Sequence, residues 1–169
     1  IVMSKLELLT LYVDPAWRRS GIHSVLMIPW WGNPYEDVAV LAKQTFDAYE
    51  FDTTYYTVTN VIEEADIVFA PYRHEWFLRH DESLFEECVR IAEAAKLPIL
   101  VDGIGDVEHP IKAKNAYILR YGGYRFMNER GRIQIPPCAD DLLDRYKNGQ
   151  LSIRKKRYVN PHVGFAGWT

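Results

Sequence analysis

The sequence is poor in the groups that metal ions and disulfide frameworks require. Its 169 residues include only two cysteines, Cys88 and Cys138, which are far apart and outside any CxxC motif. A zinc site or a redox pair would place such cysteines a few residues apart, so we expect both to be reduced and structural. The five histidines form no HxH or HxxxH pair. The sequence therefore predicts no metal site and no bound cofactor.

The sequence also lacks a long hydrophobic run and a charge excess of either sign. Its longest apolar stretch, residues 25–31, is far shorter than the ~20 residues that cross a bilayer, and no signal peptide precedes it. The formal net charge is −3, which gives no long-range attraction to nucleic acid. We therefore expect a cytoplasmic chain without a membrane segment or a nucleic-acid partner. Peripheral attachment of the full-length protein to a membrane stays open.

Apolar runs that alternate with helical patterns predict an α/β fold. Strand-like runs lie at residues 6–13, 52–59, 65–72, 97–102, 116–120 and 133–135, and helical spacing lies at 35–49, 81–95 and 141–147. Strands separated by helices in this way are typical of βαβ units. We therefore expect a Rossmann-like, mostly parallel sheet with helices on both faces. The runs near Leu6, Ile67, Leu97 and Ala116 are the most continuous, so these strands should be central.

The pattern also predicts where the domain ends. Residues 1–149 carry the α/β pattern, the polar and basic span 150–161 is typical of a linker, and an apolar run follows at 162–169. A single buried strand cannot satisfy its own backbone groups. We therefore expect residues 162–169 to be the first strand of a second domain that is absent from this chain, and to pack against something outside the first domain.

Chemically useful side chains follow several of the predicted strands. Open parallel sheets bind ligands beyond the carboxyl ends of their strands. The residues expected at that rim are Asp14, Tyr72, Arg73, His74, Asp102, Asp106, Arg120, Tyr121, Tyr124 and Arg125. Together they would offer carboxylates, guanidinium groups, an imidazole and aromatic faces on one edge of the sheet.

Each of these residues also has a structural interpretation. Asp102 and His74 are the candidates for a catalytic base, but an Asp after a strand commonly forms a turn or caps a helix, and a lone His in a loop is commonly solvated. The Gly pair after Asp102 lacks the third glycine of a dinucleotide fingerprint. The catalytic base therefore stays unassigned at this stage.

Arginine and aromatic side chains are the candidates for ligand binding. Gly122 and Gly123 let the backbone turn after the strand at 116–120, so Arg120, Tyr124 and Arg125 could converge on a sugar that carries hydroxyl, carboxylate or phosphate groups. The alternative is that the arginines only tie down their loop. Three tryptophans in early loops, Trp17, Trp30 and Trp31, are expected on the same side as these groups, where their rings could stack on a sugar.

Four short motifs, taken in order, resemble those of the exostosin-like glycosyltransferases. They are Ala65–Tyr72 (ADIVFAPY), Asn115–Phe126 (NAYILRYGGYRF), Ile133–Pro137 (IQIPP) with Asp140–Leu143 (DDLL), and Val163–Trp168 (VGFAGW). No one motif is specific by itself. The resemblance lies in their order and spacing, and it covers the chain from Ala65 to its end.

The resemblance implies a two-domain GT-B architecture, of which this chain would be the acceptor-side half. It then implies inverting transfer of a sugar from a nucleotide sugar to a saccharide acceptor, with Arg120, Tyr124, Arg125, Tyr72 and Arg73 as acceptor-binding candidates. It also places Gly167 at the donor side, in the second domain. Without that domain the isolated chain is expected to be inactive. A saccharide-binding or interaction domain without catalysis is the alternative.

Overall fold

A computed structural model describes residues 8–35, 39–48, 50–104, 110–121 and 131–135. All of them belong to one compact unit, Ile1–Pro137. The predicted helix at 141–147, the linker and the strand at 162–169 lie outside the described residues. No helix in the described part is long and apolar enough to span a membrane.

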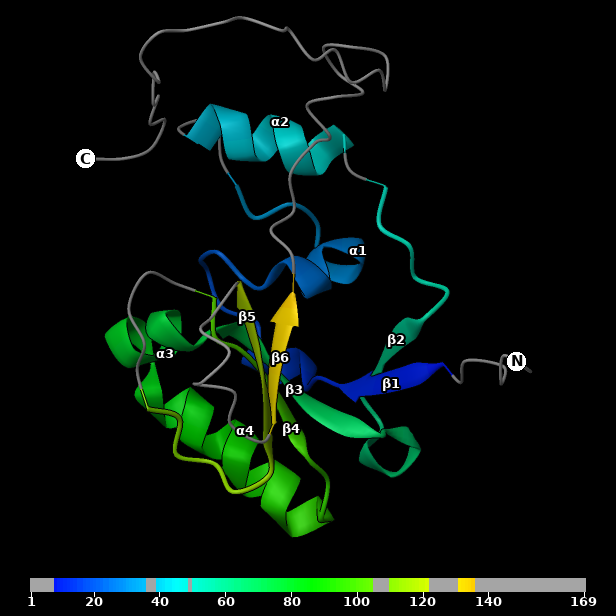
Figure 1. The fold of residues 1–169 in the computed structure, drawn as a ribbon, viewed down its shortest axis with the longest axis vertical. Helices are drawn as coiled ribbons and strands as arrows, with labels where there is room; N and C mark the ends of the chain where they lie inside the picture. Colours follow the sequence, from blue (N-terminus) through cyan, green and yellow to red (C-terminus); the bar gives the residue numbers. More distant parts are fainter. Residues whose placement is uncertain (1–7, 36–38, 49, 105–109, 122–130, 136–169) are drawn as a thin grey trace, which may run out of the picture. The chain divides into compact units, whose positions relative to one another are not determined.

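The unit is built on a six-stranded sheet in which every pair of neighbouring strands is parallel. The strands are β1 (Leu9–Tyr12), β2 (Tyr56–Thr59), β3 (Ile67–Arg73), β4 (Ile99–Asp102), β5 (Ala116–Tyr121) and β6 (Arg132–Ile135), in the order β2-β1-β3-β4-β5-β6. The predicted parallel α/β fold is thus confirmed. The four strands expected at the centre are the four inner strands, with β2 and β6 at the edges (Figure 1).

The strand order reverses between β1 and β3, because the chain moves from β1 to one side to form β2 and then returns to the other side to form β3. In doubly wound sheets the connections that leave two neighbouring strands at such a reversal run to opposite sides of the sheet. A crevice therefore opens between them at the carboxyl ends of the two strands. The topology therefore points to the carboxyl ends of β1 and β3 as the region in which to look for a ligand site.

The strand register shows how the two faces of the sheet differ. Tyr12 contacts Trp17 edge to face, and Trp17 Nε1 donates a hydrogen bond to Glu87 of α4 (Glu82–Ala95), so Tyr12 faces the α4 side. Leu9 pairs with Tyr56, whose hydroxyl donates to the carbonyl of Leu26. Tyr56 therefore faces the other side, which the segment around α1 (Ile28–Trp31) partly covers.

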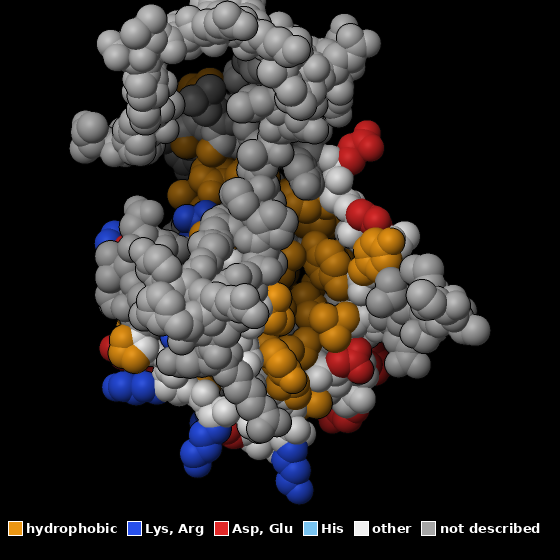
Figure 2. Space-filling model, in the orientation of Figure 1, with side chains coloured by type: hydrophobic (Ala, Val, Ile, Leu, Met, Phe, Trp, Pro, Cys, Tyr) orange, Lys and Arg blue, Asp and Glu red, His pale blue; other side chains and the backbone are white. Residues whose placement is uncertain are grey.

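The face opposite α4 keeps apolar side chains exposed at Leu9, Tyr117 and Ile133. The register places the three on that one side, because Tyr117 pairs with Leu100 and Ile133 pairs with Leu119. Figure 2 shows hydrophobic side chains gathered on the side of the sheet away from α3 and α4. The described part of the chain therefore covers the two faces of the sheet unequally.

The helices match the sequence pattern in part. The predicted helix at 81–95 is α4, which the Asp81 carboxylate caps by accepting a hydrogen bond from the amide of Leu84, and its buried residues are Leu84, Phe85, Cys88 and Ala92. The predicted helix at 35–49 is α2 (Val40–Ala48) in the described residues. The structure adds α3 (His74–His80), which follows β3 directly in a segment that we expected to be a loop.

Aromatic rings fill much of the core beneath α3 and α4. Phe77 and Tyr72 are fully buried, Phe85 contacts Phe77, and the Tyr72 and Trp76 rings stack with 4.1 Å between their centroids. Trp17 also belongs to this core with 1% of its surface exposed. The sequence predicts Trp17 at the carboxyl edge with the other candidate ligand-binding side chains. This prediction is wrong, because the turn after β1 folds its ring back onto Tyr12.

Candidate functional site

The chain leaves β1 through a capped turn and then crosses the carboxyl edge of the sheet. Asp14 Oδ1 accepts a hydrogen bond from the amide of Ala16 at 2.8 Å and starts the short 3₁₀ helix η1 (Pro15–Trp17). Asp14 therefore has the capping role that was its structural interpretation. Farther along, Ser24 donates its amide hydrogen to the carbonyl of Pro71, which fixes this segment against β3.

Residues 18–31, which we call the crossing segment, form one wall of an open pocket at the carboxyl ends of β1 and β2. The pocket has a volume of about 450 Å³. Its lining consists of aromatic and polar side chains from the segment and of residues at the strand ends, namely Val13, Pro15, Arg18, Trp30, Trp31, Val58, Thr59 and Asn60. We refer to it as the tryptophan pocket. Trp30 and Trp31 thus lie at the carboxyl edge of the sheet, as predicted.

Two interactions hold the aromatic wall of the tryptophan pocket. Arg18 donates from Nη2 to the carbonyl of Trp31 at 3.1 Å, and its guanidinium carbon lies 5.7 Å from the centroid of the Trp31 ring. Trp30 contacts the Tyr56 ring with 5.1 Å between centroids and still keeps 36% of its surface exposed. The wall therefore presents an aromatic ring beside a cation, which suits a flat or ring-shaped polar ligand.

Arg18 keeps its charge available for such a ligand. Its neighbour Arg19 is paired with Asp81 at 3.4 Å. For Arg18, by contrast, the structure gives no ion pair to any carboxylate of the described residues. A guanidinium group held by a carbonyl and a ring can still donate from its other nitrogens.

Asp102 ends β4 and is almost fully buried, with 1% of its surface exposed. Its Oδ1 accepts a hydrogen bond from the amide of Ile104 at 3.0 Å. Burial raises the pKa of Asp102, while the Ser24 hydroxyl, the Ile104 amide and the positive charge of Arg73 act in the opposite direction. Asp102 therefore stabilises the turn after β4 through its hydrogen bond with Ile104, and its carboxyl group is not exposed to solvent.

Arg73 and Asp102 are register partners at the carboxyl ends of β3 and β4. Arg73 Nη2 also donates to the hydroxyl of Tyr35, at 3.5 Å. These two predicted site residues thus lie side by side. Arg73 is half-buried.

Arg120 lies close to the same turn but is engaged by it. Its Nη1 donates to the carbonyl of Gly103 at 3.1 Å. Gly103 is tightly packed, because a Cβ at that position would lie 2.7 Å from Cγ2 of Ile118. Arg120 therefore ties down the turn after β4, which is close to the alternative stated for it, although its partner here is a carbonyl and not a carboxylate.

Tyr72 does not lie at the open rim where the sequence predicted it. Its side chain is 0% exposed, and its hydroxyl accepts from the amide of Arg19 and donates to the carbonyl of the same residue at 2.9 Å. Burial raises its pKa. Tyr72 thus anchors the crossing segment to β3. It is buried because it belongs to the strand β3 and not to the loop after it.

His74 is buried and starts α3, so it is not the solvated loop residue that its structural interpretation described. Its ring contacts Phe85 with 5.0 Å between centroids. It lines a second cavity beside α4 and is absent from the lining of the tryptophan pocket. The two candidates for a catalytic base, Asp102 and His74, are therefore not brought together in either pocket.

Sequence reasoning missed His23 and Ser24. His23 forms an isolated antiparallel bridge with Tyr72, and its ring lies edge to face against Trp31 at 5.4 Å. Burial lowers its pKa, so the imidazole is held in its neutral form near neutral pH. Both residues occur in a polar stretch after Gly21, and nothing in the local pattern distinguishes them from a solvated loop.

Several predicted site residues lie outside the described part of the chain. These are Asp106, Tyr124, Arg125 and Gly167, and the side chain of Tyr121 is not described either. Within the described residues, no group of three or more His, Cys, Asp or Glu side chains is arranged to hold a metal ion.

Comparison with known proteins gives no relative from which a function could be transferred. No protein-family model matches the chain. Searches of curated proteins and of solved structures likewise return no match. The functional argument therefore depends on the sequence motifs and on the geometry described above.

Proposed function

We propose that this chain forms the acceptor side of an exostosin-like glycosyltransferase that moves a sugar from a nucleotide sugar to a saccharide acceptor with inversion. The observation that carries the proposal is the tryptophan pocket, which combines the Trp30 and Trp31 rings with the Arg18 guanidinium that lies over Trp31, at the carboxyl ends of parallel strands. An aromatic face beside hydrogen-bond donors is a suitable arrangement for a sugar ring. The order of the four motifs agrees with this proposal.

In this proposal the residues around β4 position the site and do not carry out chemistry. Arg73 lies at the rim and can contact an acceptor hydroxyl or an anionic group. Asp102 and Arg120 shape the turn that supports this rim, through the Ile104 amide and the Gly103 carbonyl. The nucleotide sugar would be held by a domain outside this chain, and the catalytic base is unassigned.

The proposal is tested by assaying transfer with the full-length protein. A panel of nucleotide sugars is incubated with oligosaccharide acceptors, and products are detected by mass spectrometry. The variants Trp30→Ala and Arg18→Ala should each raise KM for the acceptor about tenfold or more, equivalent to ~1.4 kcal/mol. Tyr55→Ala, which removes another exposed ring outside the pocket lining, serves as the matched control and should leave KM unchanged.

The same experiment separates the alternative function. A saccharide-binding domain without catalysis would bind oligosaccharides in calorimetry, lose that binding in Trp30→Ala, and give no product with any donor. The lining of the tryptophan pocket also fits this alternative, because it offers aromatic rings and a guanidinium group for binding. A binding site needs no catalytic base. If folded protein neither transfers nor binds any saccharide, both functions are wrong.

A further inference from the structure

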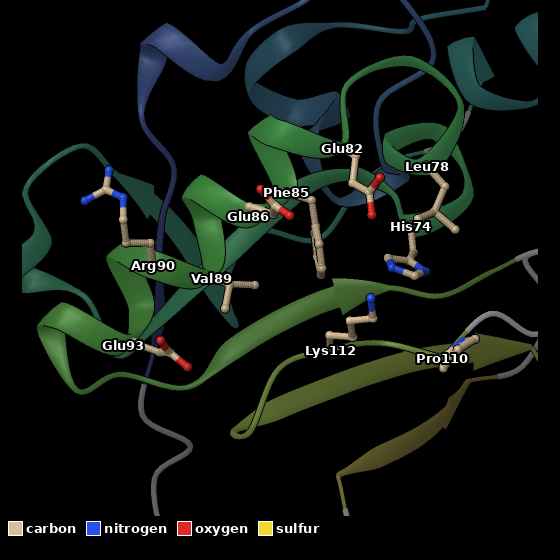
Figure 3. Close-up of a pocket in the computed structure, with 10 residues that line it drawn as sticks. All are labelled: His74, Leu78, Glu82, Phe85, Glu86, Val89, Arg90, Glu93, Pro110 and Lys112. Atoms are coloured by element: carbon tan, nitrogen blue, oxygen red, sulfur yellow. The ribbon is translucent and has the colours of Figure 1, made fainter.

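A groove beside α4 is separate from the tryptophan pocket and has no role in the proposed transfer. Its volume is about 410 Å³, and it lies between α4 and the connection that leads from β4 to β5. The two cavities share no lining residue. We call it the α4 groove, and Figure 3 shows the residues that line it.

The groove lies where a parallel sheet would ordinarily carry another helix. The connection from β3 to β4 supplies α3 and α4. The next connection, from β4 to β5, contains no helix in its described residues, 103–104 and 110–115. Crossovers between parallel strands usually pack a helix on the sheet, so the groove is the space beside α4 that such a helix would fill.

The side chains of the groove form an apolar floor with charged walls. Phe85, Val89 and Leu78 provide the apolar surface. Glu82, Glu86, Arg90 and Glu93 line the α4 side, where three carboxylates outnumber one guanidinium group, and Lys112 lies on the opposite side with its ammonium group pointing toward Phe85 in Figure 3. The structure gives no ion pair for these five charged side chains within the described residues.

The length and the charges of the groove select one kind of occupant. From Glu82 to Glu93 the α4 wall extends for about three helical turns, or ~16 Å. An amphipathic helix meets such a surface with an apolar stripe at i, i+3, i+4 and i+7. Basic residues along one side of that stripe would face the α4 carboxylates, and an acidic residue along the other side would face Lys112.

We propose that the α4 groove binds an amphipathic helix of a partner protein, with its apolar stripe on Phe85 and Val89, its basic side against α4 and its acidic side against Lys112. The partner helix would occupy the space beside α4 in which a crossover helix commonly packs on a parallel sheet. This surface is independent of saccharide transfer, so variants in the groove should change partner binding without changing KM for an acceptor.

The test uses a synthetic peptide and the full chain. The probe is a fluorescein-labelled peptide of about three helical turns, with leucines at i, i+3, i+4 and i+7, arginines on one side of them and glutamates on the other. Fluorescence anisotropy should show saturable binding. The double variant Glu82→Gln/Glu86→Gln should weaken it about tenfold or more, and Glu50→Gln/Glu63→Gln, which removes the same charge elsewhere, should not.

Two further measurements keep the test decisive. Leu78→Ser, at an exposed apolar position of the groove, should also weaken binding, and a scrambled peptide of equal composition should bind at least about tenfold more weakly. Thermal unfolding shows whether each variant is folded. The proposal is overturned if folded chain does not bind the peptide, if the scrambled peptide binds equally well, or if the two double variants behave alike.

Discussion

The hydroxyl of Tyr72 joins β3 to the segment that crosses the carboxyl edge of the sheet. Both of its hydrogen bonds go to the backbone of Arg19, in surroundings where the Tyr72 ring is fully buried. A part-buried hydrogen bond of this kind contributes about 0.5–1.5 kcal/mol to stability. The anchoring of the tryptophan pocket thus depends on a residue that does not line it.

Tyr72→Phe tests this anchoring. The substitution keeps the ring but removes the partner of the amide and carbonyl of Arg19, so the free energy of unfolding should fall by about 0.5–1.5 kcal/mol, the net value of a part-buried hydrogen bond. Chemical denaturation measures the change. Tyr55→Phe removes a hydroxyl from a ring that is 57% exposed and should change stability little. Equal effects of the two variants would contradict the anchoring role.

Asp102 gives a prediction with a definite sign in pH. Because burial raises its pKa above the ordinary 3.8, the native state keeps a proton that the unfolded chain has released. The contribution of Asp102 to the free energy of unfolding should therefore fall as the pH rises from about 3.8 through the folded-state pKa. Asp102→Asn removes this dependence and can still accept the hydrogen bond from Ile104.

The measurement compares urea unfolding of the native protein and Asp102→Asn between about pH 4 and pH 7. The variant should gain stability relative to the native protein as the pH rises. A variant that loses stability toward neutral pH would show instead that the ionised carboxylate is stabilised by Arg73.

At the scale of the elements, close packing around Gly103 determines the conformation of the turn that follows β4. Gly103→Ala would place a Cβ 2.7 Å from Cγ2 of Ile118 and 3.2 Å from the carbonyl oxygen of Leu119, so it should cost about 1–3 kcal/mol. Thermal unfolding measures the loss. In an Ile118→Ala background the same substitution should cost less, since the closest atom is gone. Strictly additive costs would contradict this explanation.

The elements that could be predicted from sequence are those whose local pattern and tertiary setting agree. β3 and β4 lie inside the sheet with both faces covered, so their buried residues form continuous apolar runs. The α4 cap at Asp81 likewise has a local signature. These features need no knowledge of distant contacts.

The elements that sequence reasoning missed depend on contacts between distant segments. α3 is short and its N-cap residue, Arg73, makes no capping hydrogen bond, so no local signal marks its start. Trp17 occurs in a polar stretch, yet its partners Tyr12 and Glu87 draw it into the core. The same holds for the candidate site, where Trp30 and Trp31 were found but His23 was not.

On the scale of the whole molecule, the sheet should not be equally stable across its width. β3 has neighbours on both sides and is buried along almost its whole length, whereas β2 and β6 each have one neighbour. Local opening therefore costs less at the edges. Hydrogen–deuterium exchange followed by mass spectrometry should show the slowest exchange in β3 and β4 and faster exchange in β2 and β6. Equally slow exchange in β2 would contradict this order.

The stacked rings beneath the crossing segment give the protein an optical signal. Tyr72 lies 4.1 Å from Trp76 and 6.0 Å from Trp31, measured between ring centroids, and Trp31 belongs to the wall of the tryptophan pocket. Aromatic chromophores held this close in a fixed, asymmetric arrangement couple their electronic transitions. A near-ultraviolet circular dichroism band from this cluster would therefore report whether the pocket wall is seated on β3, before any ligand is known.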